Sequence, residues 1–124
     1  MHWEDAVGAR GWRAERLLES VREELSNLLE YEVNDPRIAF AIITDVRLSP
    51  DLHTVLVYVR LPGDENENKD SLKALKAAQG FIRYELGQRL GLKHVPNVDF
   101  HLDLSEKSGQ LLDDLLRREQ AGQE

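Results

Sequence analysis

The chain has 124 residues, of which 16 are lysine or arginine and 23 are aspartate or glutamate, so its formal net charge is −7. Hydrophobic residues make up 41% of it, which excludes a wholly disordered chain. The length suits a single domain and excludes a large multidomain enzyme. The absence of cysteine rules out disulfides, thiolate nucleophiles and cysteine-bound zinc.

The beginning of the chain has neither the basic region nor the apolar core of a signal peptide. The longest apolar run, Ile38–Ile43, is too short to cross a bilayer. We therefore expect a cytoplasmic protein that does not enter membranes. We divide it into a flexible leader at residues 1–12, a folded domain at residues 13–104 and a tail at residues 105–124.

Helical spacing of apolar residues begins at Arg13. Residues three or four positions apart form one stripe: Leu17, Leu18, Val21, Leu25, Leu28 and Leu29. We expect the helix to stop before Asn34-Asp35-Pro36, because proline disfavours the helical conformation of the residue before it and has no amide hydrogen to donate.

Two strands are predicted next, Phe40–Leu48 and Thr54–Leu61, because apolar and polar side chains alternate in both. The residues predicted to face inward are Phe40, Ile42, Val46 and Leu48 in the first strand, and Val55, Val57, Val59 and Leu61 in the second. The connecting turn, Ser49–Leu52, is short and contains Pro50, so the pair is expected to be an antiparallel hairpin.

The second half of the chain contains a polar stretch, a helix, a strand and a tail. Residues 62–70 are acidic and are expected to form a solvated loop. Helical spacing returns at Ser71–Leu90, interrupted by Gly80, and Gly91 closes the helix. The helix buries Leu72, Leu75, Ala78, Ile82, Leu86 and Leu90, the strand Val98–Leu104 buries Val98, Phe100, Leu102 and Leu104, and the tail has an amphipathic stretch at Leu111, Leu112, Leu115 and Leu116. The sequence therefore predicts an α+β fold with the order α-β-β-α-α-β, in which helices cover one face of a three-stranded sheet.

Positive charge is concentrated in one segment. Residues 71–98 carry five basic side chains and only one acidic one, Glu85, whereas the rest of the chain is acidic on balance. The basic residues are Lys73, Lys76, Arg83, Arg89 and Lys93. A polyanion would be attracted to this segment and repelled elsewhere, which favours a single docking orientation.

Two glycines, Gly80 and Gly87, fall on the same helical face as Lys73, Lys76 and Arg83 when the turn of an α-helix is applied to the segment. Glycine destabilises a helix, so two on one face require an explanation. One explanation is close approach of a sugar-phosphate backbone. The other is that Gly80 makes a bend and Gly87 relieves a contact between helices.

Sequence motifs for enzymatic chemistry are absent. The chain has no phosphate-binding loop, dinucleotide fingerprint, zinc-protease motif or nucleophile elbow. Asp99, His101 and Asp103 alternate on one strand and have side chains that can ligate a divalent cation. We interpret them as the solvated face of a half-buried strand, so we expect no metal, cofactor or small-molecule substrate.

Several stretches, taken in order, resemble a known family. They are Asn34–Ile38, Asp45–Leu52, Ala78–Gly87 and Val95-Pro96, followed by Phe100, Asp103, Ser105 and Gly109. Together they resemble ribosome-binding factor A, a bacterial assembly factor of the small ribosomal subunit, over roughly Arg13 to Leu116. The resemblance implies a type II KH-like fold in which the usual G-x-x-G loop is replaced by a kink, here Ala78-Gln79-Gly80. It further implies a non-enzymatic protein that binds immature small-subunit RNA, assists its maturation near the decoding region and supports growth in the cold.

Three functional hypotheses follow. The leading one is a monomeric assembly factor that binds free 30S subunits and 16S rRNA through Lys73, Lys76, Gly80, Arg83, Arg89 and Lys93. The second is an acidic protein-interaction module that docks a partner helix on its Leu111–Leu116 stripe. The third is a metal-dependent enzyme at Asp99, His101 and Asp103.

Overall fold

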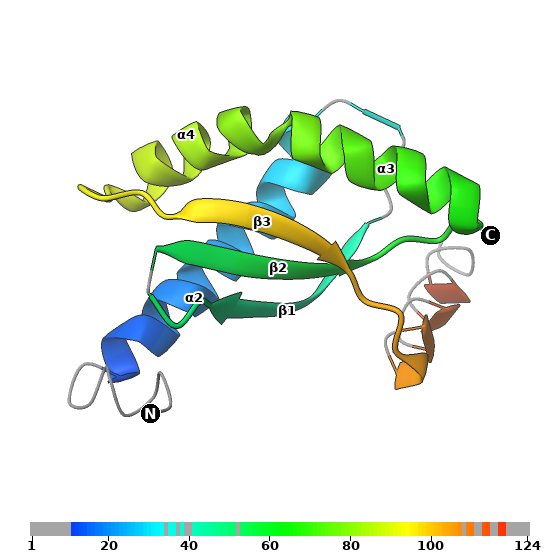
Figure 1. The fold of residues 1–124 in the computed structure, drawn as a ribbon, viewed down its shortest axis with the longest axis horizontal. Coiled ribbons are helices and arrows are strands. Elements are labelled where there is room, and N and C mark those ends of the chain that lie inside the picture. Colours follow the sequence, from blue (N-terminus) through cyan, green and yellow to red (C-terminus); the bar gives the residue numbers. More distant parts are fainter. Residues whose placement is uncertain are drawn as a thin grey trace.

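The fold is a three-stranded sheet with helices packed on one of its faces. The computed structural model describes residues 11–33, 35–36, 38, 41–51, 53–107, 109–110, 113–114 and 117–118. Its elements follow the order α2, η2, β1, β2, α3, α4 and β3. Figure 1 shows α2 crossing the sheet diagonally, while α3 and α4 follow each other along its β3 edge. The predicted α+β architecture, with its broken second helix, is confirmed.

The first helix, α2, spans Gly11–Asn27 and so begins two residues before its predicted start. It continues as a short π-helix, η2 (Leu28–Glu32), and the helix ends at Val33, just before the predicted stop. Four residues of the predicted stripe are buried, and Leu17 and Leu18 pack against the same core. The buried residues are Val21, Leu25, Leu28 and Leu29.

The sheet has the strand order β1-β2-β3, with β2 in the centre. β1 (Ile42–Leu48) and β2 (Thr54–Arg60) form the predicted antiparallel hairpin. β3 (Asn97–Leu102) pairs with β2 in parallel, because the chain crosses back along α3 and α4 before it enters the sheet again. All three predicted strands are therefore present, each slightly shorter than its hydrophobic pattern.

One residue of β1 breaks the predicted alternation. The pairing with β2 shifts between Ile43 and Asp45, which leaves Thr44 as the extra residue of a β-bulge. The bulge turns Ile43 into the core, and Ile42, which was predicted to face inward, lies on the opposite side. Val46 is buried as expected, whereas Phe40 lies outside the described residues.

The core lies between the helices and the inner face of the sheet. Val55, Val57 and Val59 of the central strand are fully buried, and Leu61 is nearly so, as predicted. Phe100 of β3 is also fully buried and belongs to the same apolar cluster as the buried side chains of α2, α3 and α4. A single core therefore holds α2, α3 and α4 on one face of the sheet, and none of these three helices packs on the other face.

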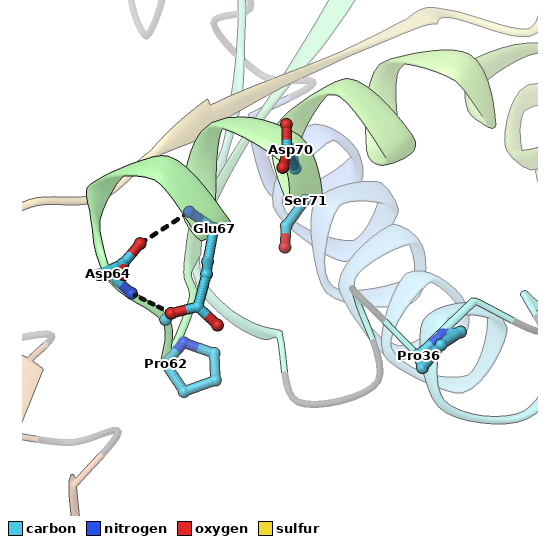
Figure 2. A pocket seen from close by; sticks show the side chains of 7 residues that line it. Pro36, Pro62, Asp64, Glu67, Asp70 and Ser71 are labelled. Carbon is cyan, nitrogen blue, oxygen red and sulfur yellow. Dashed lines mark hydrogen bonds between the residues drawn. The ribbon is translucent and has the colours of Figure 1, made fainter.

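α3 spans Glu65–Ala77, so the prediction of a loop over residues 62–70 is wrong from Glu65 onward. Asp64 caps the helix: its carboxylate accepts a hydrogen bond from the Glu67 amide (2.8 Å), and the Glu67 carboxylate accepts one from the Asp64 amide (3.1 Å; Figure 2). This capping box satisfies two backbone donors, and the negative charges favour the helix N-terminus. The acidic residues thus start a helix.

The helical break falls at Ala78, between α3 and α4 (Gln79–Leu90); this is the first residue of the predicted kink Ala78-Gln79-Gly80, two residues before the interruption predicted at Gly80. Ala78 has φ −87° and ψ −2°, and its amide is shared between the carbonyls of Ala74 and Leu75 (both 3.1 Å). On either side of the break, Leu75 and Ile82 are fully buried. The bend therefore lets both helices keep their apolar side chains on the sheet.

α4 ends as predicted at a glycine, because Gly91 adopts the left-handed conformation with φ 61°. β3, however, ends at Leu102, and Leu104 is 75% exposed although it was predicted to face the core. Beyond the strand, the Arg60 guanidinium donates to the Asp103 carbonyl (3.0 Å), which holds the departing chain. The leucines of the predicted amphipathic tail lie outside the described residues. No helix that the structure describes is both long and apolar enough to span a membrane.

The two glycines predicted to share the basic face have different surroundings. A Cβ added at Gly80 would meet nothing within 4 Å, so Gly80 faces open space. Gly87 is buried, and a Cβ there would approach Cγ2 of Val95 to 2.6 Å. Gly87 therefore packs against Val95 and is not part of the basic face. The explanation that Gly87 relieves an internal contact is the better one, although the contact is with the segment before β3 and not with another helix.

This contrast predicts opposite effects of the same substitution. Gly80→Ala is expected to raise the free energy of unfolding by about 0.5 kcal/mol, because alanine stabilises a helix and the site has room. Gly87→Ala is expected to lower it by about 1 kcal/mol, because Val95 must move. Urea denaturation of the two variants measures both values, and equal effects would contradict the assignment.

Candidate functional site

Exposed basic side chains lie on the outer side of α3 and α4, around the bend. Lys73 and Lys76 are exposed on α3, and Gly80 and Arg83 are exposed on α4. Their spacings of three and four residues place them on one side of the two helices, which run nearly end to end (Figure 1). We call these four residues the basic strip.

The two lysines of the basic strip are available to an anion. Within the described ranges of the chain, neither ammonium group pairs with a carboxylate. Lys93, exposed in the segment between α4 and β3, is in the same situation. These side chains can therefore bind phosphate without first giving up an internal partner.

Arg83 has a structural contact as well as an exposed position. Its Nη2 donates a hydrogen bond to the carbonyl of Val95 (2.9 Å), which anchors the segment leading into β3. The guanidinium has five N–H donors, so one internal hydrogen bond leaves others for a ligand. Arg83 thus joins the basic strip to the edge of the sheet.

A cleft of about 360 Å³ opens between the start of α4 and the sheet. The helix contributes Gln79, Gly80 and Arg83 to its lining, and the strands contribute Thr54, Asn97, Val98 and Asp99. Because Gly80 has no side chain and faces open space, a ligand can approach the helix backbone closely at this point. Two members of the predicted kink, Gln79 and Gly80, therefore line a cleft beside the basic strip.

Arg89 is held by three carboxylates, although it was predicted to contact RNA. Its guanidinium lies 3.4 Å from carboxylate oxygens of Glu24, Glu32 and Glu85. Desolvation lowers the pKa of Arg89, but the hydrogen bonds to the three carboxylates outweigh it, and the net effect is a raised pKa. Since its charge is compensated internally and ties α4 to α2 and η2, we leave Arg89 out of the basic strip.

Two exposed aromatic residues flank Arg83, and the sequence analysis assigned them no role. Phe81 is 46% exposed and Tyr84 is 63% exposed. Bases stack on exposed aromatic rings in many surfaces that bind single-stranded nucleic acids, but at spacings of two and one residues neither ring shares the helix face of Arg83. The signal that could have found them is their absence from the buried stripe of the helix.

The three alternating polar residues Asp99, His101 and Asp103, the last of which lies just beyond β3, do not converge on one point. His101 Nε2 lies 2.9 Å from Oδ2 of Asp99. The Asp103 carboxylate accepts hydrogen bonds from the Thr44 hydroxyl (2.6 Å) and from the Ser105 amide (2.9 Å). In the part of the chain that the structure describes, no three histidine or acidic side chains form a group that could hold a metal ion.

A second cavity, of about 440 Å³, lies at the N-terminal end of α3 (Figure 2). Its polar lining includes the carboxylates of Asp64, Glu67 and Asp70, and Pro36 and Pro62 contribute apolar walls. Three carboxylates repel phosphate, so this cavity is not suited to a nucleic acid. The cleft beside the basic strip remains the better candidate.

Comparison with known proteins gives a consistent result. The family model for ribosome-binding factor A matches residues 13–116. The ribosome-binding factor A proteins of two strains of Desulfitobacterium hafniense are each 44% identical over 105 residues, covering 85% of this chain and 84% of the relative. The crystal structure of ribosome-binding factor A from Thermus thermophilus is 27% identical, with a TM-score of 0.54 over 72% of this chain and 90% of that one. A homology model of the Thermus protein, fitted into a cryo-electron microscopy map of a 30S complex, is also 27% identical, with a TM-score of 0.53 over 72% of this chain and 89% of that one.

The position of Arg89 predicts that its loss affects stability and not RNA binding. Arg89→Gln removes the charge that compensates three carboxylates, so the urea midpoint of unfolding is expected to fall. The salt dependence of RNA binding is expected to stay as in the wild type, because no phosphate contact is lost. A flatter dependence on salt would place Arg89 in the interface after all.

Proposed function

The chain belongs to the ribosome-binding factor A family, and on that premise we propose that it binds the immature small ribosomal subunit and assists maturation of 16S rRNA without being an enzyme. The observation that carries the proposal is the pair of exposed lysines, Lys73 and Lys76, beside the open backbone at Gly80. Arg83 and Lys93 extend the contact. The protein acts as a monomer.

The relative from Thermus supports this choice of partner. That protein was fitted into a map of a 30S complex, and this chain has the same fold over 72% of its length. We carry the small subunit over to this chain as its binding partner.

Electrostatics explains how an acidic protein can bind RNA. The net charge of −7 opposes contact with a polyanion over most of the surface. The basic strip reverses the sign locally, so phosphates are attracted to one side of α3 and α4 only. This arrangement favours one orientation on the subunit and disfavours nonspecific coating.

The mechanism uses binding energy and breaks no bond. Contacts between lysine or arginine and phosphate fix the position of a protein on RNA but read little sequence. Specificity therefore comes from the shape of the folded RNA, and the factor stabilises one premature conformer of it. Such binding hinders early use of the subunit until the RNA has folded further.

The basic strip predicts a specific salt dependence of binding. Lys73→Gln/Lys76→Gln removes two phosphate contacts, so the slope of log K against log salt on small-subunit RNA is expected to flatten by nearly two units. The control Lys107→Gln/Arg118→Gln removes the same charge from exposed positions in the tail and is expected to leave the slope unchanged. Equal effects of the two variants would contradict the proposed interface.

The proposed partner predicts how the protein sediments in a sucrose gradient of cell extract. Tagged wild-type protein is expected to migrate with free small subunits and to be absent from translating ribosomes. The Lys73→Gln/Lys76→Gln variant is expected to shift toward the top of the gradient. Migration with translating ribosomes would contradict a role in maturation.

A further inference from the structure

The face of the sheet opposite the core carries a patterned set of polar and aromatic side chains. Its rows follow from the strand register, in which Tyr58 lies between Asp45 and His101, and Leu56 lies between Arg47 and Asp99. We call these six residues the open face. They come from all three strands and alternate with the buried residues of the core.

Three planar side chains lie next to one another at the centre of the open face. The Tyr58 ring is 5.7 Å from the His101 ring, centroid to centroid, with an angle of 31° between the planes. On the other side, the Arg47 guanidinium carbon is 5.6 Å from the centroid of the Tyr58 ring. Tyr58 is half-buried and has the Arg47 guanidinium over its ring, while Arg47 and His101 are exposed, so the two outer members of the group are the more accessible ones.

Carboxylates hold the outer members of this group in place. Asp45 accepts a hydrogen bond from Arg47 Nε (2.6 Å), and this hydrogen bond raises the pKa of Arg47. Asp99 is paired with His101 at 2.9 Å. The positive charge of Arg47 is therefore compensated by Asp45, in contrast to the charges of the two lysines in the basic strip.

The open face is continuous with the cleft beside the basic strip. Asp99 belongs to the open face and also lines the cleft, together with Gly80 and Arg83. Thr54 and Asn97, which form the adjoining row of the sheet, line the cleft as well. A strand of RNA with its phosphates on α4 therefore has a direct path for its bases over the edge of β3.

We propose that the open face binds unpaired bases of the RNA whose phosphates contact the basic strip, with Tyr58 and His101 as the stacking surface. This inference rests on the proposed function and adds a base-contacting surface to it. The carboxylates of Asp45 and Asp99 accept hydrogen bonds from the amino groups of bases. Arg47 adds a planar cation on which a base can also stack.

The chemistry of the open face fits bases better than phosphates or a protein partner. Its one arginine is paired with Asp45, and Asp99 adds a carboxylate, so the open face offers phosphate no net attraction. The anchors of protein interfaces are usually large apolar or aromatic side chains at the centre of the patch, whereas five of the six residues here carry polar groups and the only apolar one, Leu56, is half-buried. Base stacking requires only exposed π surfaces and tolerates any base.

The test compares two RNA strands of about twelve nucleotides, one with bases and one with abasic sugars throughout, which carry the same charge. Fluorescence anisotropy gives the affinity of each. The wild type is expected to bind the base-carrying strand about tenfold more tightly, and Tyr58→Leu to lose that preference while binding the abasic strand unchanged. The control Tyr31→Leu removes another exposed tyrosine, on η2, and is expected to keep the preference.

Further variants distinguish a folding defect from the loss of base contact, and failure of this inference from failure of the proposed function. Urea denaturation shows whether Tyr58→Leu is folded, and Tyr58→Trp, which keeps an aromatic ring, is expected to restore the preference. If the wild type binds both strands equally, or if Tyr58→Leu keeps the preference, the inference is wrong. The proposed function then still stands provided that Lys73→Gln/Lys76→Gln flattens the salt dependence. Loss of a protein contact in Tyr58→Leu with RNA affinity unchanged would also overturn the inference.

Discussion

The contact between α4 and the segment before β3 determines the shape of the candidate interface. Gly87 has no side chain, so Val95 packs directly against the helix, and Arg83 reaches the Val95 carbonyl one turn earlier. Together these contacts hold the start of β3 beside the start of α4. The cleft between Gly80 and Asp99 therefore has two walls that are fixed to each other. A ligand bound there meets a preformed surface, which reduces the ordering that binding requires.

The cations of residues 71–98 carry the same charge but differ in how far they already contact other groups of the protein. Arg89 is paired with carboxylates from α2, η2 and α4, so it stabilises helix packing. Arg83 shares its donors between Val95 and the exterior. Lys73 and Lys76 are exposed and, among the described residues, unpaired with carboxylates. The number of cations in a basic segment is thus the largest number that can contact a polyanion. Cations that are paired with carboxylates of the protein itself reduce that number.

Within the described residues, periodicity in the sequence was enough to predict the three strands and the main part of each helix, because each has one buried face. It failed where one residue changes the register. The bulge at Thr44 follows from the pairing with β2, and the bend at Ala78 from packing on the sheet, and neither has a local pattern. The start of α3 did have a local pattern, because Asp64 lies three residues before Glu67 as in a capping box. The acidic composition of the stretch favoured a loop instead. The lysines of the site followed from charge, whereas the partners Glu24 and Glu32 of Arg89 lie about sixty residues away in sequence.

The proposed division between the basic strip and the open face reconciles an acidic chain with the proposed RNA partner. Binding to phosphate depends on unpaired cations. It weakens at high salt, because the release of counterions from the RNA then contributes less free energy. Stacking of bases on Tyr58 and His101 depends on π surfaces and is insensitive to that release. Under the two proposals, affinity that remains at high salt measures the open face, and affinity lost between low and high salt measures the cations that contact phosphate. The two proposals together explain how a chain with net charge −7 would bind RNA, because the proposed second contact needs no charge.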